Sequence, residues 1–196
     1  MKYFIFVLAS LTCSSAFADD IRLGQPIYGG NGCPQGTASA VLSPDQKTLS
    51  ILFDQYSVEA GRTTGRNVDR KSCNIAIPVH VPNGLSISLF TVDYRGYNSL
   101  PAGAYSQLNA DYFFAGQRGP SFSKRFWGNL NENYLASSAI PATAIAWSAC
   151  GADTNLRINS SLMAQTNSAN QQTMSTVDSA DIKSGLIYHI QWRTCP

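Results

Sequence analysis

The chain has 196 residues, of which 14 are Lys or Arg and 12 are Asp or Glu, so its formal net charge is only +2. Charged residues make up 13% of the chain and aromatic residues 11%, a composition that excludes a solvated, disordered tail. The near-neutral balance argues against nucleic acid as the main partner, because phosphate binding requires a clear basic excess.

The N-terminus has the organisation of a secretory signal peptide. Lys2 precedes an apolar run at residues 3–11, and small residues lead to an A-x-A exit that ends at Ala18. We expect residues 1–18 to be a signal peptide and residues 19–196 to form a single exported domain. The location expected for that domain is extracellular, periplasmic or on the cell surface.

Two other interpretations of the N-terminus fit less well. The apolar run is shorter than the roughly 20 residues that a membrane-spanning helix needs, and no later stretch is apolar enough to predict a transmembrane segment. Acylation of Cys13 would make the protein a lipoprotein. However, Ser10-Leu11-Thr12 lacks the small residue that usually precedes an acylated cysteine.

Short alternating apolar runs separated by turn signals extend along the rest of the chain. Ser43-Pro44-Asp45-Gln46 and Pro82-Asn83-Gly84 are typical of turns. Pro78 has no backbone N–H to donate, which predicts an edge strand or a bulge at that position. The predicted strands are residues 40–42, 48–58, 72–81, 85–94, 104–108, 111–115, 144–148, 155–163, 173–177 and 186–193.

This pattern predicts an all-β protein with about nine strands. Helical periodicity is almost absent, apart from one possible turn at residues 179–184. Residues 59–71 and 118–138 carry weak strand signals, and we expect both to be long loops, where binding sites are often found. No linker divides the chain. The expected fold is therefore a single-domain antiparallel β-sandwich, either jelly-roll-like or immunoglobulin-like.

Four cysteines follow the predicted signal peptide. Cys33, Cys73, Cys150 and Cys195 form no C-x-x-C pair, which disfavours zinc, and an even number in an exported chain indicates two disulfides. Three connectivities are possible. We favour Cys33–Cys73 with Cys150–Cys195, so that each bridge closes one half of the domain, and we assign both a structural role.

Several phrases, in this order and at this spacing, resemble a known family. The resemblance covers residues 30–196 and points to the secreted family of fungi and bacteria catalogued as domain of unknown function 4360. It departs at Ala149, where the family more often has proline. The resemblance implies an exported, cysteine-bridged domain without an established activity, and it supplies no catalytic residues. The phrases are Gly32-Cys33-Pro34-Gln35-Gly36-Thr37, Cys73-Asn74-Ile75, Val92-Asp93-Tyr94-Arg95-Gly96-Tyr97, Tyr112-Phe113-Phe114-Ala115-Gly116, Trp147-Ser148-Ala149-Cys150-Gly151, Leu156-Arg157-Ile158-Asn159, Val177-Asp178-Ser179 and Gln191-Trp192-Arg193-Thr194-Cys195.

The residues offer little support for catalysis, and we assign no catalytic residue. A serine nucleophile would need a base, but His80 and His189 both lie in predicted strands and there is no G-x-S-x-G motif. Glycoside hydrolysis would need two carboxylates facing each other across the bond, and the sequence pairs none. The carboxylate candidates are Asp54, Glu59, Asp93, Glu132, Asp178 and Asp181.

No cofactor is expected. The cluster at residues 178–181 resembles a calcium site only in having oxygen ligands at a turn, since the D-x-D-x-D-G pattern is missing. A helix N-cap or an Asx turn explains Asp178 equally well.

Basic and aromatic residues give the candidate binding sites. Arg62, Arg66, Arg70 and Lys71 form the densest basic stretch, which suits an anionic glycan or an ordinary solvated loop. A second group either binds sugars or proteins through exposed rings or closes the end of the sandwich. That group consists of Arg118, Phe122, Lys124, Arg125, Phe126 and Trp127. The ligand-binding candidates are Arg62, Arg66, Asp93, Arg95, Arg125 and Trp127.

Three further residues carry specific expectations. Trp147 and Trp192 each lie near a cysteine, and we expect them to pack in the core against the bridges. Asn159-Ser160-Ser161 fits the N-glycosylation pattern, which acts only in a eukaryotic host and only if Asn159 faces solvent.

The leading hypothesis is a non-enzymatic binding domain, secreted or on the cell surface. Its partner would be an extracellular glycan, another envelope component or a surface protein. The alternatives are a structural or protein-interaction module of the envelope or wall, and a carboxylate-based hydrolase.

Overall fold

The structure is a computed structural model that describes residues 20–44, 48–140, 145–177 and 186–195. This described part contains thirteen strands and no helix. The predicted signal peptide, the possible helical turn at residues 179–184 and the acidic cluster at residues 178–181 lie outside the described residues.

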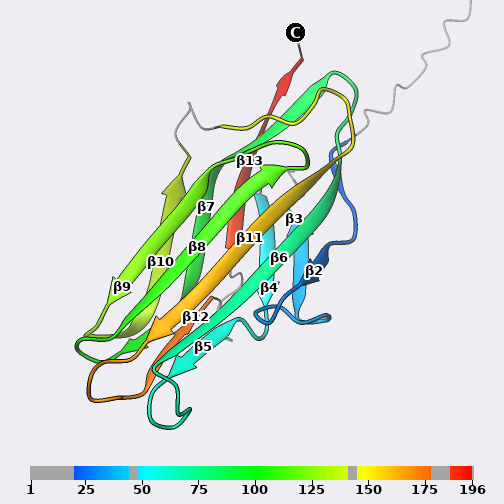
Figure 1. The fold of residues 1–196 in the computed structure, drawn as a ribbon. Coiled ribbons are helices and arrows are strands. Elements are labelled where there is room, and N and C mark those ends of the chain that lie inside the picture. Colours follow the sequence, from blue (N-terminus) through cyan, green and yellow to red (C-terminus); the bar gives the residue numbers. More distant parts are fainter. Residues whose placement is uncertain (1–19, 45–47, 141–144, 178–185, 196) are drawn as a thin grey trace, which may run out of the picture.

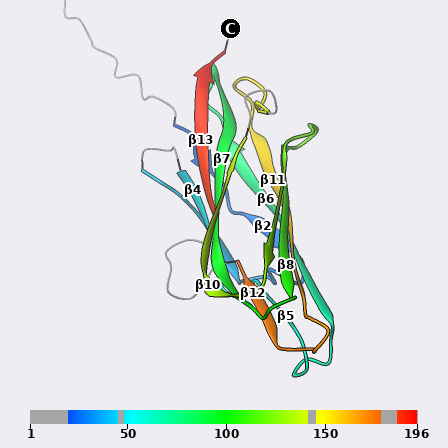
Figure 2. The same ribbon diagram turned by 90° about the vertical axis from the view of Figure 1, so that its left-hand side faces the viewer.

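The strands form two antiparallel sheets that pack face to face (Figures 1 and 2). The front sheet, which faces the viewer in Figure 1, contains β1 (Arg22–Leu23), β2 (Ile27–Gly29), β6 (Val68–His80), β8 (Tyr105–Phe114), β9 (Ser121–Trp127) and β11 (Thr154–Gln165). The back sheet contains β3 (Ala38–Leu42), β4 (Thr48–Phe53), β5 (Ser57–Ala60), β7 (Leu85–Leu100), β10 (Leu130–Ala139), β12 (Thr173–Thr176) and β13 (Leu186–Thr194). The expected all-β sandwich is confirmed.

The strand order is that of a jelly roll. If β4, β6, β7, β8, β9, β10, β11 and β13 are counted from first to eighth, the back sheet runs first, eighth, third, sixth. The front sheet runs second, seventh, fourth, fifth. This order decides between the two sandwich types expected from the sequence. As in a double Greek key, each sheet combines strands from both halves of the chain, and among these eight strands only the fourth and fifth are consecutive neighbours in one sheet.

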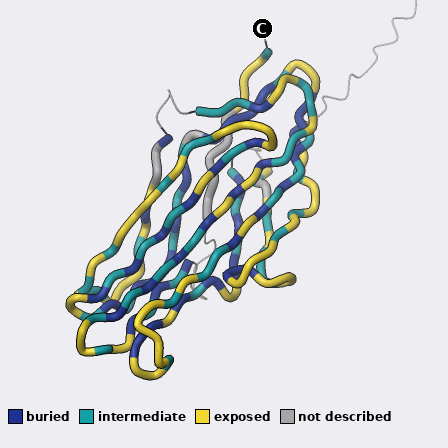
Figure 3. The backbone as a smooth tube through the Cα atoms, viewed as in Figure 1, coloured by how far each residue is buried: buried dark blue, intermediate teal, exposed yellow. Residues whose placement is uncertain are grey.

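The core lies between the sheets and follows the two-residue period of the strands. On β11, Leu156, Ile158 and Leu162 are buried, whereas Arg157 and Asn159 between them are exposed. Figure 3 shows the same alternation along every long strand of the front sheet. Apolar side chains therefore drive the sheets together and leave every second residue free for surface chemistry.

Both disulfides have the favoured pairing. Cys33 bonds to Cys73, which ties the segment between β2 and β3 to the inner face of β6, and both residues are fully buried. Cys150 bonds to Cys195 and holds the end of β13 to the segment that follows Trp147. Each bridge closes a loop of 40 or more residues and restricts the unfolded chain.

The prediction of a loop at residues 118–138 was wrong. This segment forms the hairpin of β9 and β10, which crosses from the front to the back sheet. Within the described chain, β9 pairs only with β8 and β10 only with β7, so both are edge strands. Edge strands commonly carry charged and polar residues. Because of these residues, β9 and β10 lack the regular apolar alternation that predicts a strand.

Other strand boundaries differ in smaller ways. The predicted loop at residues 59–71 shrinks to a turn, because β5 ends at Ala60 and β6 begins at Val68. The strand predicted at residues 48–58 divides into β4 and β5, and the two predicted between 104 and 115 join into β8. In place of the strand at residues 144–148, the described residues show one isolated bridge, from Trp147 to Ser88.

Pro78 lies within a strand that has neighbours on both sides, but its position explains why it is tolerated. Its carbonyl oxygen accepts a hydrogen bond from the backbone N–H of Gly24, in the interruption between β1 and β2. In a strand, the N–H and the C=O of one residue point to the same neighbouring strand. The N–H that proline lacks would therefore point toward the gap between β1 and β2, and the hydrogen bonds between β6 and β11 remain complete. The predicted turn before β7 is confirmed, with Gly84 at φ +79°.

Candidate functional site

The outward-facing side chains of the front sheet form an ordered polar surface. The strand register places them in rows that cross the strands from β9 to β6. We call the three rows nearest the β9–β10 turn the front face. Its first row is Trp127, Tyr105, Gln165 and Val68, its second row is Arg125, Gln107, Met163 and Arg70, and its third row is Ser123, Asn109, Ser161 and Ser72.

Two aromatic rings and a guanidinium group form one corner of the front face. The indole of Trp127 is 59% exposed, and its ring centroid lies 5.2 Å from that of Tyr105. The guanidinium carbon of Arg125 lies 4.8 Å from the Tyr105 ring and 5.4 Å from the Trp127 ring. These distances are within the range of cation–π attraction, which holds the three side chains together at the surface.

A chain of side-chain hydrogen bonds continues from Arg125 into the next rows. Its Nε and Nη2 donate to Oε1 of Gln107 at 3.0 and 2.6 Å, and Nε2 of Gln107 donates to Oδ1 of Asn109 at 3.0 Å. Ser123 Oγ also donates to Asn109 Oδ1, at 2.8 Å, while Asn109 Nδ2 donates to Ser161 Oγ at 3.4 Å. These hydrogen bonds fix the orientation of the polar groups before any ligand is bound.

The first row contains a similar bond. The hydroxyl of Tyr105 donates to Oε1 of Gln165 at 2.8 Å, which links β8 to β11 beside the aromatic corner. The front face therefore presents exposed ring surface directly beside fixed hydrogen-bond donors and acceptors. Such a surface can hold a molecule that has both apolar C–H faces and many hydroxyl groups.

Of the six predicted ligand-binding residues, the structure brings only Arg125 and Trp127 together. Arg62 and Arg66 lie in or beside the turn between β5 and β6, where Arg66 pairs with Asp69 at 3.5 Å. Asp93 and Arg95 lie at alternate positions of β7, across the sandwich from the front face, and Nε of Arg95 is buried without a hydrogen-bond partner.

Most of the front face consists of residues that the sequence patterns did not predict as binding residues. Tyr105, Gln107, Asn109 and Gln165 were not among the candidates, although they surround Arg125 and Trp127. Their signal was the alternation of polar and buried residues along β8, which is continuous only if residues 104–115 form one strand. These side chains lie beside Gln165 because β8 pairs with β11, and the local sequence does not specify that pairing.

The catalytic candidates do not converge. Asp54 follows β4, and Glu59, Asp93 and Glu132 lie on β5, β7 and β10 respectively. His80 lies on β6, where its Nδ1 is 2.7 Å from Oδ1 of Asp153. The side chain of His189 and both Asp178 and Asp181 are outside the described residues. Among the residues described, no three His, Cys, Asp or Glu side chains are grouped as metal ligands are, and no helix is long and apolar enough to cross a membrane.

The tryptophans next to the second disulfide are more exposed than expected. Trp147 is only partly buried, and the guanidinium carbon of Arg193 lies 4.2 Å from its ring. Trp192 is 38% exposed, so the expectation that it packs in the core was wrong. It lies on β13, where it pairs with Ile87 of β7, three residues before Cys195.

The space between the two sheets has a different electrostatic character from the front face. The hydroxyl of Tyr56 lies 3.1 Å from Ser160 Oγ on the inner face of β11, and burial raises the pKa of Tyr56 to about 12. Burial also raises the pKa of Tyr134. Removing a proton from either group would leave a charge between the sheets, which the low polarity there disfavours.

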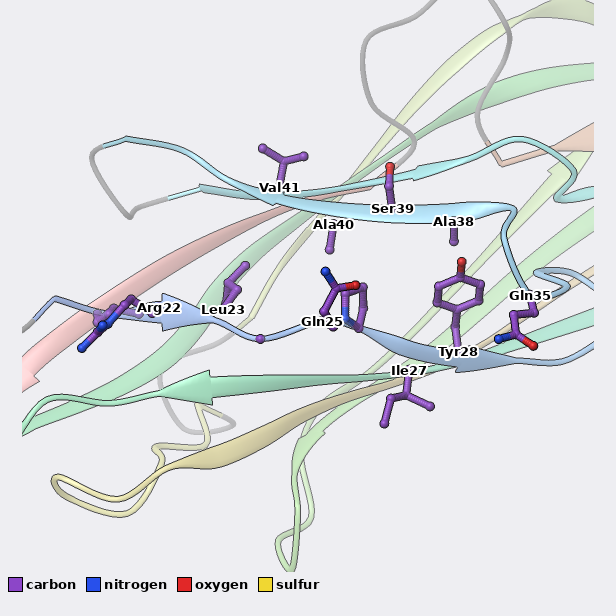
Figure 4. Close-up of a pocket in the computed structure, with 13 residues that line it drawn as sticks. Arg22, Leu23, Gln25, Ile27, Tyr28, Gln35, Ala38, Ser39, Ala40 and Val41 are labelled. Carbon is purple, nitrogen blue, oxygen red and sulfur yellow. The ribbon is translucent and has the colours of Figure 1, made fainter.

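A groove of about 1110 Å³ lies at one edge of the sandwich (Figure 4). Its walls are the segment from β1 to β2 on one side and β3 on the other, and Tyr28 and Ala38 point into the space between them. The hydroxyl of Tyr28 accepts a hydrogen bond from the backbone of Gly36. The groove lacks the ordered set of polar side chains found on the front face, which is therefore the better candidate site.

Comparisons with known proteins confirm the family resemblance. The model of a family described as a domain of unknown function (DUF4360) matches residues 19–195. An uncharacterized secreted protein of Arthroderma benhamiae is 34% identical over 178 residues, which cover 90% of this chain and 73% of that protein. A solved structure of TmCBM61 in complex with β-1,4-galactotriose is 12% identical with a TM-score of 0.30, over 86% of this chain and 88% of that one. A likeness of that size assigns no ligand to this chain.

Proposed function

The chain belongs to the DUF4360 family, and we propose that this member is an exported, non-catalytic domain that binds carbohydrate on its front face. The observation that carries the proposal is the exposed ring of Trp127 beside the half-buried ring of Tyr105, next to a network of amide, hydroxyl and guanidinium groups. Sugars combine apolar C–H faces with several hydroxyl groups, so they match both components of this surface.

The way in which the front face is held together supports a binding role. Gln107, Asn109 and Gln165 are bonded to neighbouring side chains, so little rotamer entropy remains to be lost when a ligand arrives. Asn109 and Gln165 keep unused N–H donors for a ligand, whereas Gln107 uses both of its amide N–H groups and both lone pairs of its oxygen within the network. The exposed ring of Trp127 also supports a binding role, because a large apolar area in water is unfavourable unless a ligand covers it.

Export is supported by the disulfides and by the relative. Two disulfides, of which Cys33–Cys73 is fully buried, suit an oxidising compartment, and the similar protein of Arthroderma benhamiae is described as secreted. We propose that residues 1–18 are removed as a signal peptide and that residues 19–196 form one domain.

The proposal of a non-catalytic role rests on the placement of the carboxylates. Glycoside hydrolysis requires two of them about 5 to 10 Å apart across one bond. Glu59 and Glu132 lie on different back-sheet strands, and the front face carries no carboxylate in its three rows. The chemistry available on the front face is therefore recognition.

A panel of soluble polysaccharides, screened by thermal shift and followed by calorimetry, tests the proposal. A ligand at about 100 times its Kd should stabilise the protein by about 2.7 kcal/mol, which raises Tm by about 5–10 °C in a domain of this size. Trp127→Ala should weaken binding by at least tenfold, an order of magnitude typical of a central aromatic contact.

Trp192→Ala is the matched control, because it removes another exposed tryptophan far from the front face. Equal loss of affinity in the two variants would contradict the assigned site. A panel in which no polysaccharide binds would contradict the proposed function and favour the protein-interaction alternative.

A further inference from the structure

We propose that the polysaccharide bound by the front face is acidic, with carboxylate-bearing sugar units, and that its chain crosses the strands along the second row, from Arg125 to Arg70. This inference rests on the proposed function and specifies its ligand. It comes from the placement of charge on the front sheet, which the aromatic corner alone does not predict.

Arg125 is positioned to receive an anion. Two of its five N–H donors are used by Gln107, and the rings of Tyr105 and Trp127 fix the plane of the guanidinium. Within the described part of the chain, no carboxylate lies at ion-pair distance from it. Its remaining donors form the planar fork that matches a carboxylate.

Arg70 repeats this charge at the other end of the same row. The register aligns Arg70 with Met163, Met163 with Gln107, and Gln107 with Arg125. Three strand spacings of about 4.8 Å separate the backbones of the two arginines by roughly 14 Å. Arg70 is exposed, and it too has no carboxylate at ion-pair distance among the described residues.

The acidic neighbours of this row point elsewhere. Asp69 accepts a hydrogen bond from the backbone N–H of Glu59 and pairs with Arg66, and its side chain is only 14% exposed. Along the outward positions of β6, β8, β9 and β11, arginine occurs three times, at Arg70, Arg125 and Arg157, whereas Asp111 is the single carboxylate. The outer surface of this sheet is therefore basic in a chain whose net charge is only +2.

Two separated arginines, joined by the uncharged side chains of Gln107 and Met163, suit an extended polymer with spaced charges. A single small anion would contact only one of them. A sugar ring on Trp127 would place the next units of the chain over Gln107 and Met163, in the direction of Arg70. Charged hydrogen bonds at both ends would fix the register of the chain on the sheet.

Oligogalacturonate and its fully methyl-esterified form are the probes that test this inference, because they share the ring and differ in charge. Calorimetry on the intact exported chain should show at least about tenfold tighter binding of the acid than of the ester, the size of one charged hydrogen bond. Arg70→Gln should reduce the preference for the acid severalfold, because it removes one of the two charges that the acid contacts and leaves Arg125 in place. Binding of the uncharged ester should change less than binding of the acid. Arg118→Gln, in the turn between β8 and β9 at the opposite end of these strands, is the matched control.

The outcomes separate the two proposals. Equal affinity for acid and ester, abolished in both cases by Trp127→Ala, would overturn the acidic ligand and leave carbohydrate binding intact. If Arg118→Gln reduced the preference for the acid as much as Arg70→Gln does, the second row of the front face would not be the site that recognises the charge. Equally tight binding of polyglutamate would replace the glycan with an acidic peptide, and no binding of any probe or neutral polysaccharide would overturn the proposed function itself.

Discussion

The two faces of β9 contain similar residues and have opposite roles. On the inner face, Phe122 stacks on Tyr94 with ring centroids 4.8 Å apart and planes 8° from parallel, and Phe126 lies 4.4 Å from Tyr134. On the outer face, Trp127 lies at the surface with its ring toward Tyr105. Neighbouring aromatic residues in the sequence therefore belong to the core and to the candidate site respectively.

This difference shows why the aromatic and basic cluster at residues 118–127 was ambiguous. If these residues formed a loop, binding a ligand and closing the end of the sandwich would be alternatives, because side chains in a loop do not alternate regularly between two faces. In a strand, successive side chains point to opposite faces. Both interpretations are therefore realised at once, by different residues of the same seven-residue strand.

Removing an inner aromatic ring should have the largest effect on stability. We expect Phe122→Ala to lower the free energy of unfolding by about 3 kcal/mol, since it deletes a ring packed between the sheets and leaves a cavity against Tyr94. Urea denaturation measures this loss. Trp127→Ala is the outer-face control, with an expected change below about 1 kcal/mol. A larger loss for Trp127→Ala than for Phe122→Ala would reverse the assignment of the two faces.

The inner face should also make the protein sensitive to alkali. The pKa of Tyr56 is raised from 10.0 to about 12 in the folded protein by burial, so the folded state retains a proton that the unfolded chain loses first. The stabilisation is complete below pH 10 and falls by about 2 kcal/mol as the pH rises to 12.

Urea denaturation between pH 9 and pH 12 measures this dependence. In Tyr56→Phe, the free energy of unfolding should fall less steeply with pH. Part of the fall should remain, because burial also raises the pKa of Tyr134. An unchanged slope in Tyr56→Phe would show that Tyr56 keeps its ordinary pKa and is open to water.

A change in the polar network of the outer face should affect binding more than folding. Gln107→Ala removes the acceptor of two hydrogen bonds from Arg125. We expect a stability loss below about 1 kcal/mol, because the pair is exposed, together with about tenfold weaker polysaccharide binding. Asn133→Ala on β10 removes an exposed amide of the back sheet and is the control. Binding as tight as wild type in Gln107→Ala would show that the network does not position Arg125.

The smallest effect on stability should come from a glycan at Asn159. This residue is exposed on the outer face of β11, one row beyond Ser161, so the sequence pattern for N-glycosylation coincides with the border of the front face. Protein from a eukaryotic secretory host should unfold within about 0.5 kcal/mol of the unglycosylated form, yet it should no longer bind polysaccharide. Asn159→Gln from the same host should bind normally. Full binding by the glycosylated protein would place the ligand elsewhere.

Much of the fold could be predicted from local patterns. The strand predicted from Leu85 onward, the turn at Gly84 and the pairing of the four cysteines are all confirmed. The predicted alternation holds less strictly, because Ser86 and Ser88 are buried like Ile87 between them. These features depend on residues close in sequence or on a small number of possible pairings. The strands at the sheet edges, β9 and β10, were not predicted, because their polar composition reflects their exposed position and not their backbone conformation.

The candidate site was only half visible in the sequence. Arg125 and Trp127 are recognisable as candidates because a cluster of arginine and aromatic residues is unusual in a chain with so few charges. Gln107, Asn109 and Gln165 are not recognisable in this way, since single amides are common on any solvent-facing strand. Only their hydrogen bonds, made across three strands, distinguish them.

By itself, therefore, the sequence determined the class of fold, the disulfide framework and the family, because periodicity, cysteine number and motif order are properties of the linear chain. The tertiary structure decided the jelly-roll order, the edge position of β9 and the neighbours of Trp127. Those features depend on which strands pair, and pairing brings together residues as distant as Tyr105 and Gln165. The physical reason is that a sheet surface is assembled across strands, whereas local sequence specifies only the direction in which each side chain points.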